Sequence, residues 1–162
     1  MIVVADTSVL INLYRVGQGG LIQQLFEEVV IPPEVAWEFA RLAGRTRRFA
    51  GLTIPNGIRQ QAPTTQPAAV RSAMGLDAGE AAAWSLAVGI HADAILIDER
   101  RGYEIAVRLG LRTIGILGLL LRAKSVGLVP AVKPILDALE HDAGFWLTES
   151  LRKKVLHAAS EN

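Results

Sequence analysis

The chain has 162 residues, a formal net charge of +1 at pH 7 and 51% hydrophobic residues, which is typical of one globular domain and neither favours nor excludes nucleic acid as a partner. It has no cysteine, which excludes disulfides and zinc–thiolate sites and indicates a reducing compartment. Because no apolar run approaches the roughly 20 residues of a membrane span, and no basic segment precedes the short apolar N-terminus, we expect a single cytoplasmic domain over residues 1–162 that makes no contact with a membrane.

The N-terminal segment Ile2–Ala5 is a short run of small and apolar residues that leads directly into Asp6. Such a run predicts a parallel strand, because parallel strands are buried on both faces. Apolar residues then recur at helical spacing over 8–16, so the polar residues 6–8 form a strand-to-helix turn. A carboxylate at this turn would lie at the carboxyl end of its strand, where α/β sheets bind ligands.

The remaining elements alternate between strands and helices. Further strands are predicted at 29–31, 52–58, 94–97 and 112–116; helices are predicted at 21–26, from 33 to about 49–51, at 81–88, from 99 to 110, and at 117–126, 132–139 and 147–158, with a short helix from about 66 in an otherwise loop-like segment, 59–73. In the helix before Gly110, the residues expected to face inward are Tyr103, Ala106, Val107 and Leu109. The alternation predicts a three-layer α/β/α sandwich around a parallel sheet of four or five strands, with the helices from about 117 packed on it.

Two acids, Asp6 and Asp98, directly follow the two clearest buried strands. Because the carboxyl ends of parallel strands share one edge of the sheet, we expect these side chains to lie near each other. Each also has a simpler interpretation, since Asp is a favoured N-cap for the helix that follows. Thr7 and Ser8 are alternative caps, and their hydroxyls can bond a carboxylate or a metal-bound water.

Two further acids lie on predicted helices. Glu80 opens the helix that begins near Asp77, and the spacing of the two resembles a capping box. Glu38 lies in the middle of an earlier helix, where a solvated charge near Arg41 and Arg45 is the simpler interpretation.

Together Asp6, Glu38, Glu80 and Asp98 would form a carboxylate cluster in which each charge opposes ionisation of the others unless a cation is present. With oxygen ligands alone, and no histidine near these segments, Mg²⁺ or Mn²⁺ is favoured over zinc. Glu99 is either an auxiliary to such a site or an ordinary charge at a helix start.

Four segments carry a resemblance to a known family. Residues 4–11 (VADTSVLI) resemble the opening motif of the PIN-domain nucleases; residues 35–39 (VAWEF), 78–82 (AGEAA) and 95–99 (ILIDE) resemble the second, third and fourth acidic motifs, in the same order and spacing over about 1–116. Segment 115–128 matches a bacterial and archaeal subgroup. The chain departs from the family pattern at Leu96, where Thr or Ser is common, and at Glu99, where the subgroup often has Asp.

The resemblance implies a PIN-like fold and a Mg²⁺- or Mn²⁺-dependent endoribonuclease. Such a nuclease is commonly the VapC-like toxin of a toxin–antitoxin pair and is often a homodimer. The expected partners are therefore RNA, a small antitoxin protein and a second copy of this chain. The catalytic and metal-binding residues would be Asp6, Asp98, Glu80 and, most peripherally, Glu38. Because acids repel RNA, phosphate contacts are expected from flanking cations. The candidates are Arg41, Arg45, Arg48, Arg100 and Arg101, although each is equally well an ordinary solvated charge.

Three enzyme or receiver classes with acids or glycines in similar places fit less well. A phosphorelay receiver lacks its middle-strand Asp, a dehalogenase-like phosphatase would need Asp where Ser8 stands, and a dinucleotide-binding fold would need glycines directly after the first strand. The serious alternative is a catalytically weak PIN-like protein that binds RNA or a partner, with the apolar C-terminal helices either forming the interface or serving as ordinary core.

Overall fold

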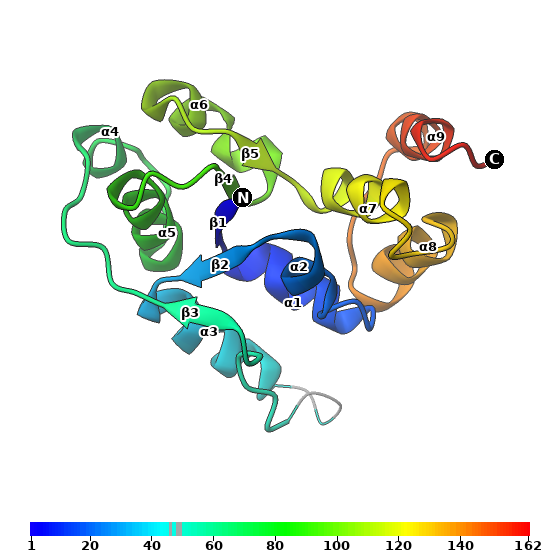
Figure 1. Cartoon of the computed structure of the whole chain (residues 1–162), viewed down its shortest axis with the longest axis horizontal. Helices are drawn as coiled ribbons and strands as arrows, with labels where there is room; N and C mark the ends of the chain where they lie inside the picture. Colours follow the sequence, from blue (N-terminus) through cyan, green and yellow to red (C-terminus); the bar gives the residue numbers. More distant parts are fainter. Residues whose placement is uncertain (46, 48–49) are drawn as a thin grey trace.

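The computed structural model describes residues 1–45, 47 and 50–162, and for residues 99 and 101 the backbone only. Its middle layer is a parallel sheet (Figure 1). The strands are β1 (Ile2–Ala5), β2 (Glu28–Ile31), β3 (Ile58–Gln60), β4 (Ala94–Leu96) and β5 (Thr113–Ile114), in the order β3-β2-β1-β4-β5. Strand β1 is central, because Val4 pairs with Val30 on one side and with Ile95 on the other.

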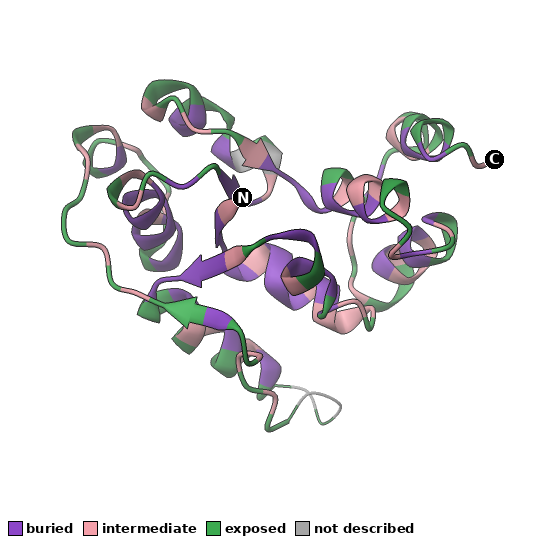
Figure 2. Cartoon of the chain, viewed as in Figure 1, coloured by how far each residue is buried: buried purple, intermediate pink, exposed green. Residues whose placement is uncertain are grey.

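The central strands are apolar because both of their faces are covered. Val3, Val4 and Ala5 are fully buried, and Figure 2 shows β1, β2 and β4 as buried against an exposed β3. The helices are α1 (Thr7–Arg15), α2 (Leu21–Leu25), α3 (Pro33–Ala43), α4 (Ala68–Arg71), α5 (Ala78–Gly89), α6 (Glu99–Leu109), α7 (Ile116–Ser125), α8 (Lys133–Asp142) and α9 (Glu149–Ala158).

Helices cover both faces of the sheet. Helix α3 packs between α1 and α5, and α5 lies on β1 and β4, whereas α2 lies on β2 and contacts α7. The predicted three-layer α/β/α sandwich with a parallel sheet is therefore confirmed, with five strands.

The strand order contains a switch point beside β1. The chain moves from β1 outward to β2 and β3, and then returns to place β4 on the other side of β1. Ligands of open α/β sheets bind at such reversals, outside the carboxyl ends of the strands. The residues that follow β1 and β4 are Asp6, whose N–H donates to the carbonyl of Leu96 at 2.9 Å, and the segment 97–98.

Two predicted boundaries are wrong. The third strand was expected at 52–58 but is Ile58–Gln60. Gly57 has a φ of +94°, and the N–H of Ile58 closes a turn on the carbonyl of Pro55, so pairing begins only after this turn. The helix from Pro33 ends at Ala43 rather than near 49–51, because Gly44, a poor helix former, closes the last turn on the carbonyl of Ala40.

The predicted inner face of α6 is partly wrong. Ala106 is buried as expected, but Tyr103 and Val107 are 68% and 63% exposed. The face that packs inward contains Gly102 and Ile105, and a Cβ on Gly102 would lie 2.9 Å from the buried ring of Trp84. A glycine carries no apolar signal, so the close approach that sets the rotation of this helix is invisible in a hydrophobic pattern.

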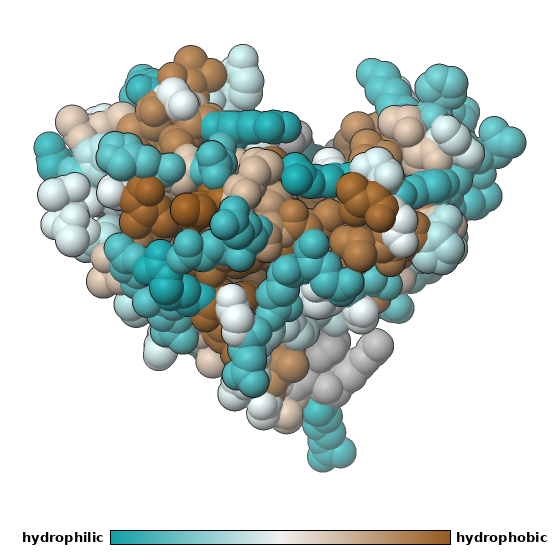
Figure 3. All heavy atoms as spheres, in the orientation of Figure 1, coloured by the Kyte–Doolittle hydropathy of each residue, from teal (hydrophilic) through white to brown (hydrophobic). Residues whose placement is uncertain are grey.

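The C-terminal helices form an extension of the core that is tied by ion pairs. Leu119, Leu120, Val155 and Leu156 are buried, so these apolar residues are core. Seen from the side of Figure 1, hydrophobic residues still reach the surface over α7 and α8 (Figure 3).

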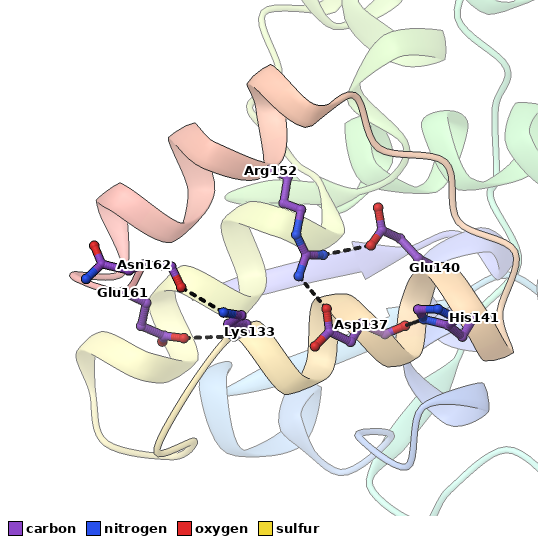
Figure 4. A network of polar contacts seen from close by, with 7 residues as sticks. All are labelled: Lys133, Asp137, Glu140, His141, Arg152, Glu161 and Asn162. Atoms are coloured by element: carbon purple, nitrogen blue, oxygen red, sulfur yellow. Dashed lines mark hydrogen bonds and ion pairs between the residues drawn. The ribbon is translucent and has the colours of Figure 1, made fainter.

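Charged side chains bridge these helices (Figure 4). Arg152 of α9 pairs with Asp137 and, at 2.7 Å, with Glu140 of α8. Glu161 accepts bonds from the ammonium of Lys124 at 2.5 Å and from the backbone N–H groups of Val132 and Lys133 at 2.7 and 2.9 Å. These donors, with Lys124 first, lower the pKa of Glu161 to about 2.

Candidate active site

Asp6 lies where β1 ends and α1 begins. Its extended backbone makes it the N-cap of α1, and its carboxylate accepts bonds from the N–H of Ser8 at 3.4 Å and from the Ser8 hydroxyl at 2.8 Å. The simpler interpretation of Asp6 as a helix cap is therefore correct as far as it goes. The residue is nevertheless only 4% exposed, which is rare for an acid without a cationic partner.

Glu38 approaches the same turn from α3. The hydroxyl of Thr7 donates to Glu38 Oε2 at 2.9 Å, which connects the β1–α1 turn to α3. The same carboxylate oxygen lies beside the first turn of α5, where a Cβ on Gly79 would be 3.0 Å away. Glycine at position 79 thus makes room for the carboxylate of Glu38.

Asp77 and Glu80 form the capping box of α5. The N–H of Glu80 donates to Asp77 Oδ1 at 2.7 Å, and the N–H of Asp77 donates to Glu80 Oε2 at 3.1 Å. Glu80 is nevertheless turned inward and is 5% exposed. Glu80 therefore takes part in the capping box and points into the protein at the same time.

Asp98 ends the β4 segment and is the N-cap of α6. Its Oδ1 accepts a bond from the N–H of Arg100 at 3.1 Å, and the Nε of Arg100 lies 4.0 Å from the same oxygen. The Asp98 side chain is 40% exposed, so it is the more open of the two acids that follow central strands.

These acids line one cavity of about 280 Å³. Five carboxylates reach it, from Asp6, Glu38, Asp77, Glu80 and Asp98; the other polar residues in its lining are Thr7, Ser8, Asn12 and Arg15. Among the described lining residues Arg15 is the one cation, so acids outnumber bases five to one. Asp6 and Asp98 thus share one concavity at the switch point of the sheet.

Comparison with known proteins identifies the family. A family model described as DUF3368: PIN domain matches residues 2–161. The chain belongs to the PIN-domain family. A PIN domain is a nuclease-type fold.

Among solved structures, the PIN domain is similar to a PilT N-terminus domain protein from the hyperthermophilic archaeon Sulfolobus solfataricus P2. The TM-score is 0.53 at 20% identity, over 87% of this chain and 96% of that one, which supports the fold alone. No curated protein matches the chain. In the part of the chain that the structure describes, no helix has both the length and the apolar character needed to cross a bilayer.

Burial sets the electrostatics of the PIN-domain cavity. Loss of solvation raises the pKa of the Asp6 carboxyl above its ordinary 3.8, and the charge of Asp77 adds to this, while hydrogen bonds from Ser8 and from the backbone of Thr7 oppose it. An ionised Asp6 therefore costs folding free energy that a nearby cation would recover.

The donor chemistry of the cavity suits a hard divalent cation. Its carboxylate and hydroxyl oxygens are the ligand types of Mg²⁺ and Mn²⁺, and the buried carboxyl of Asp6 has hydroxyl and backbone N–H partners rather than an ion pair. Within the described residues, however, no three acidic or histidine side chains are grouped closely enough to hold one ion.

The flanking arginines differ in their positions. Arg41 and Arg100 line cavities next to the acidic one, whereas Arg45 lies in the exposed turn after α3. Three of the predicted residues, Arg48 and the side chains of Glu99 and Arg101, lie outside the described residues.

Three polar lining residues were missed by the sequence analysis. Asp77 was assigned to capping alone, although it both caps α5 and faces the acidic cavity. Asn12 and Arg15 lie one and two turns after Ser8 on α1. Their spacing was the available signal, since polar residues at these intervals mark one face of an otherwise apolar helix.

Proposed function

We propose that this PIN domain is a metal-dependent endoribonuclease that hydrolyses RNA phosphodiester bonds and acts as the toxin of a toxin–antitoxin pair. The observation that carries the proposal is the cavity at the switch point, where five carboxylates face a single arginine. Two of these carboxylates, those of Asp6 and Glu80, are buried, and negative charge buried beside other acids opposes folding unless a cation joins it. The nuclease-type fold of the family supports the same activity.

Asp6 and Asp98 are the first candidates for metal ligands, because they follow the two neighbouring central strands. Glu80 is the next, as a ligand or as a base that orients water, and Glu38 is the most peripheral. A bound Mg²⁺ or Mn²⁺ would supply a nucleophilic water and neutralise the phosphate. The hydroxyls of Ser8 and Thr7 hold Asp6 and Glu38 in place, so that the acids keep their orientation as RNA binds.

The test uses purified protein, a panel of single-stranded RNAs and either metal. We expect cleavage that EDTA abolishes and that Asp6→Asn and Asp98→Asn remove. Asparagine is as good an N-cap as aspartate, so each variant should keep its helix, which circular dichroism can check. Asp142→Asn, at the end of α8 and outside the acidic cavity, is the matched control and should cleave normally.

One observation favours a second candidate, a catalytically weak PIN domain that binds RNA or a partner. Among the described residues the acids are not grouped around one point. If clean protein leaves the whole RNA panel intact with both metals, this alternative replaces the nuclease.

Exposed apolar side chains support the partner-binding and homodimer parts of the proposal. Tyr103 and Val107 expose large side chains on α6, and Met74 is 97% exposed; such groups often mark interfaces. We expect the protein to elute as a dimer, and to co-purify with the small protein encoded by the adjacent reading frame. If the PIN domain is a monomer, does not bind the small protein and does not slow growth when expressed, the toxin and homodimer parts of the proposal are contradicted, but the nuclease activity is not.

A further inference from the structure

Two of the three tryptophans of the chain are exposed, and each lies under an arginine. Trp37 and Trp146 are 69% and 67% exposed, whereas Trp84 is fully buried. The guanidinium of Arg41 lies 5.5 Å from the ring of Trp37, and that of Arg100 lies 5.7 Å from the ring of Trp146. An exposed indole ring paired with a guanidinium presents an aromatic face and a positive charge at the same place.

The Trp37 pair borders the acidic cavity on the side of α3. A hollow of about 550 Å³ is lined by Trp37 and Arg41 and also by Glu38 and Asp77, which both face the acidic cavity. Glu34 lies in the same lining and adds a negative charge there. This hollow therefore shares two acids with the acidic cavity and adds an aromatic ring that the acidic cavity lacks.

The Trp146 pair borders the acidic cavity on the side of α6. Arg100 stacks on Trp146, donates to its backbone carbonyl at 3.2 Å and lies 4.0 Å from Asp98. Arg100 and Asp98 also line a hollow of about 180 Å³ with apolar walls that include Ile116, Leu117 and Phe145. Arg100 thus connects Trp146, which lies 46 positions after it in the chain, to Asp98, a candidate metal ligand.

The strand order places the two pairs on opposite sides of Asp6. Trp37 lies on α3, which follows β2, and Arg100 lies on α6, which follows β4; β2 and β4 flank β1. The acidic cavity lies at the carboxyl end of β1, between these two flanking strands.

We propose that Trp37 and Trp146 are base-stacking platforms that hold unpaired nucleotides of a single-stranded RNA on either side of the acidic cavity. The inference rests on the proposed nuclease function and narrows its substrate class. Every base has a π face, so aromatic platforms bind single strands with little sequence preference, whereas the bases of a duplex are already stacked. Arg41 and Arg100 add positive charge beside acids that would otherwise repel the phosphates.

The test measures binding separately from cleavage. The full chain carrying Asp6→Asn is titrated in EDTA with a short labelled single-stranded RNA. Adding Trp37→Ala or Trp146→Ala should weaken binding roughly five- to a hundredfold each, the range of one base-stacking contact. Trp→Phe at either position should retain most of the affinity, because it keeps the ring. Val126→Ala is the control: this side chain is 59% exposed at the end of α7 and lines neither the acidic cavity nor the two hollows beside it, and its removal should not change binding.

Two further probes separate stacking from phosphate binding. An abasic RNA of the same length should bind weakly and be insensitive to both tryptophan substitutions, and a blunt duplex should bind no better than the abasic strand. Unchanged affinity in both alanine variants, or an equal loss for intact and abasic RNA, would overturn the platforms. If binding depends on the tryptophans but the protein never cleaves RNA, the stacking platforms stand and the nuclease function is rejected. If the protein cleaves RNA but neither tryptophan affects binding, the nuclease function stands and the platforms are rejected.

Discussion

Acids at the carboxyl ends of the strands and acids among the C-terminal helices have opposite surroundings. Asp6 is buried beside other acids and its pKa is raised, whereas Glu161 is held by an ammonium and two backbone N–H groups and its pKa is lowered to about 2. In the second region ionised acids stabilise the fold. At Asp6 ionisation costs stability, and the neighbouring core strands and the bonds from Ser8 hold the carboxylate in place. Charge that opposes folding is a common mark of functional sites.

The largest expected effect separates activity in the two regions. Asp6→Asn or Asp98→Asn should lower RNA cleavage by about a hundredfold or more, because metal-assisted charge stabilisation contributes several kcal/mol. Glu161→Gln and Glu140→Gln should leave the rate unchanged. Initial cleavage rates on one RNA substrate are measured for all four variants. Equal losses of rate in the two regions would contradict the assignment of activity to the acids at the strand ends.

Stability should show the reverse pattern. Glu161→Gln should lower the free energy of unfolding by roughly 2 kcal/mol, because bonds to a charged acceptor are lost and Lys124 keeps an uncompensated charge. Asp6→Asn should raise the free energy of unfolding at neutral pH in the absence of metal, since it removes a buried charge but keeps the cap. Urea denaturation in EDTA compares the variants. A destabilised Asp6→Asn protein would show that capping, rather than desolvation, dominates at this residue.

The pH dependence follows from the two pKa shifts. Because the pKa of Glu161 is lowered from 4.5 to about 2, its stabilisation is present above pH 4.5 and is lost as the pH falls towards 2. The pKa of Asp6 is raised from 3.8, so its contribution is most favourable below 3.8 and is lost as the pH rises through the raised value. The Tm difference between Glu161→Gln and wild type should therefore shrink on acidification, and that between Asp6→Asn and wild type should grow as the pH rises from 4 towards neutrality. Differences that are flat with pH would contradict both assignments.

The smallest effect tests how closely the acidic region is packed. Gly79→Ala would place a Cβ 3.0 Å from the carboxylate of Glu38 and should reduce cleavage severalfold, about 1 kcal/mol in the barrier, by displacing it. Gly89→Ala, in open space at the end of the same helix, is the control and should be neutral or slightly stabilising. Full activity in Gly79→Ala would show that the position of Glu38 is not critical.

Much of this molecule follows from local sequence. The buried strands, the acids that end them and the capping pattern of Asp77 and Glu80 are readable because burial and capping depend on neighbours within one turn or one strand. The four acidic segments, in order and spacing, were also enough to indicate the family.

Tertiary structure alone decided the rest. The rotation of α6 depends on Gly102 fitting against Trp84, and the edge strand β3 depends on pairing rather than on apolar residues. Asp77 lines the same cavity as Asp6, and Trp146 stacks on Arg100, although the two residues of each pair are far apart in the chain. No local pattern encodes such contacts, because their free energy arises only when the sheet has brought distant segments together.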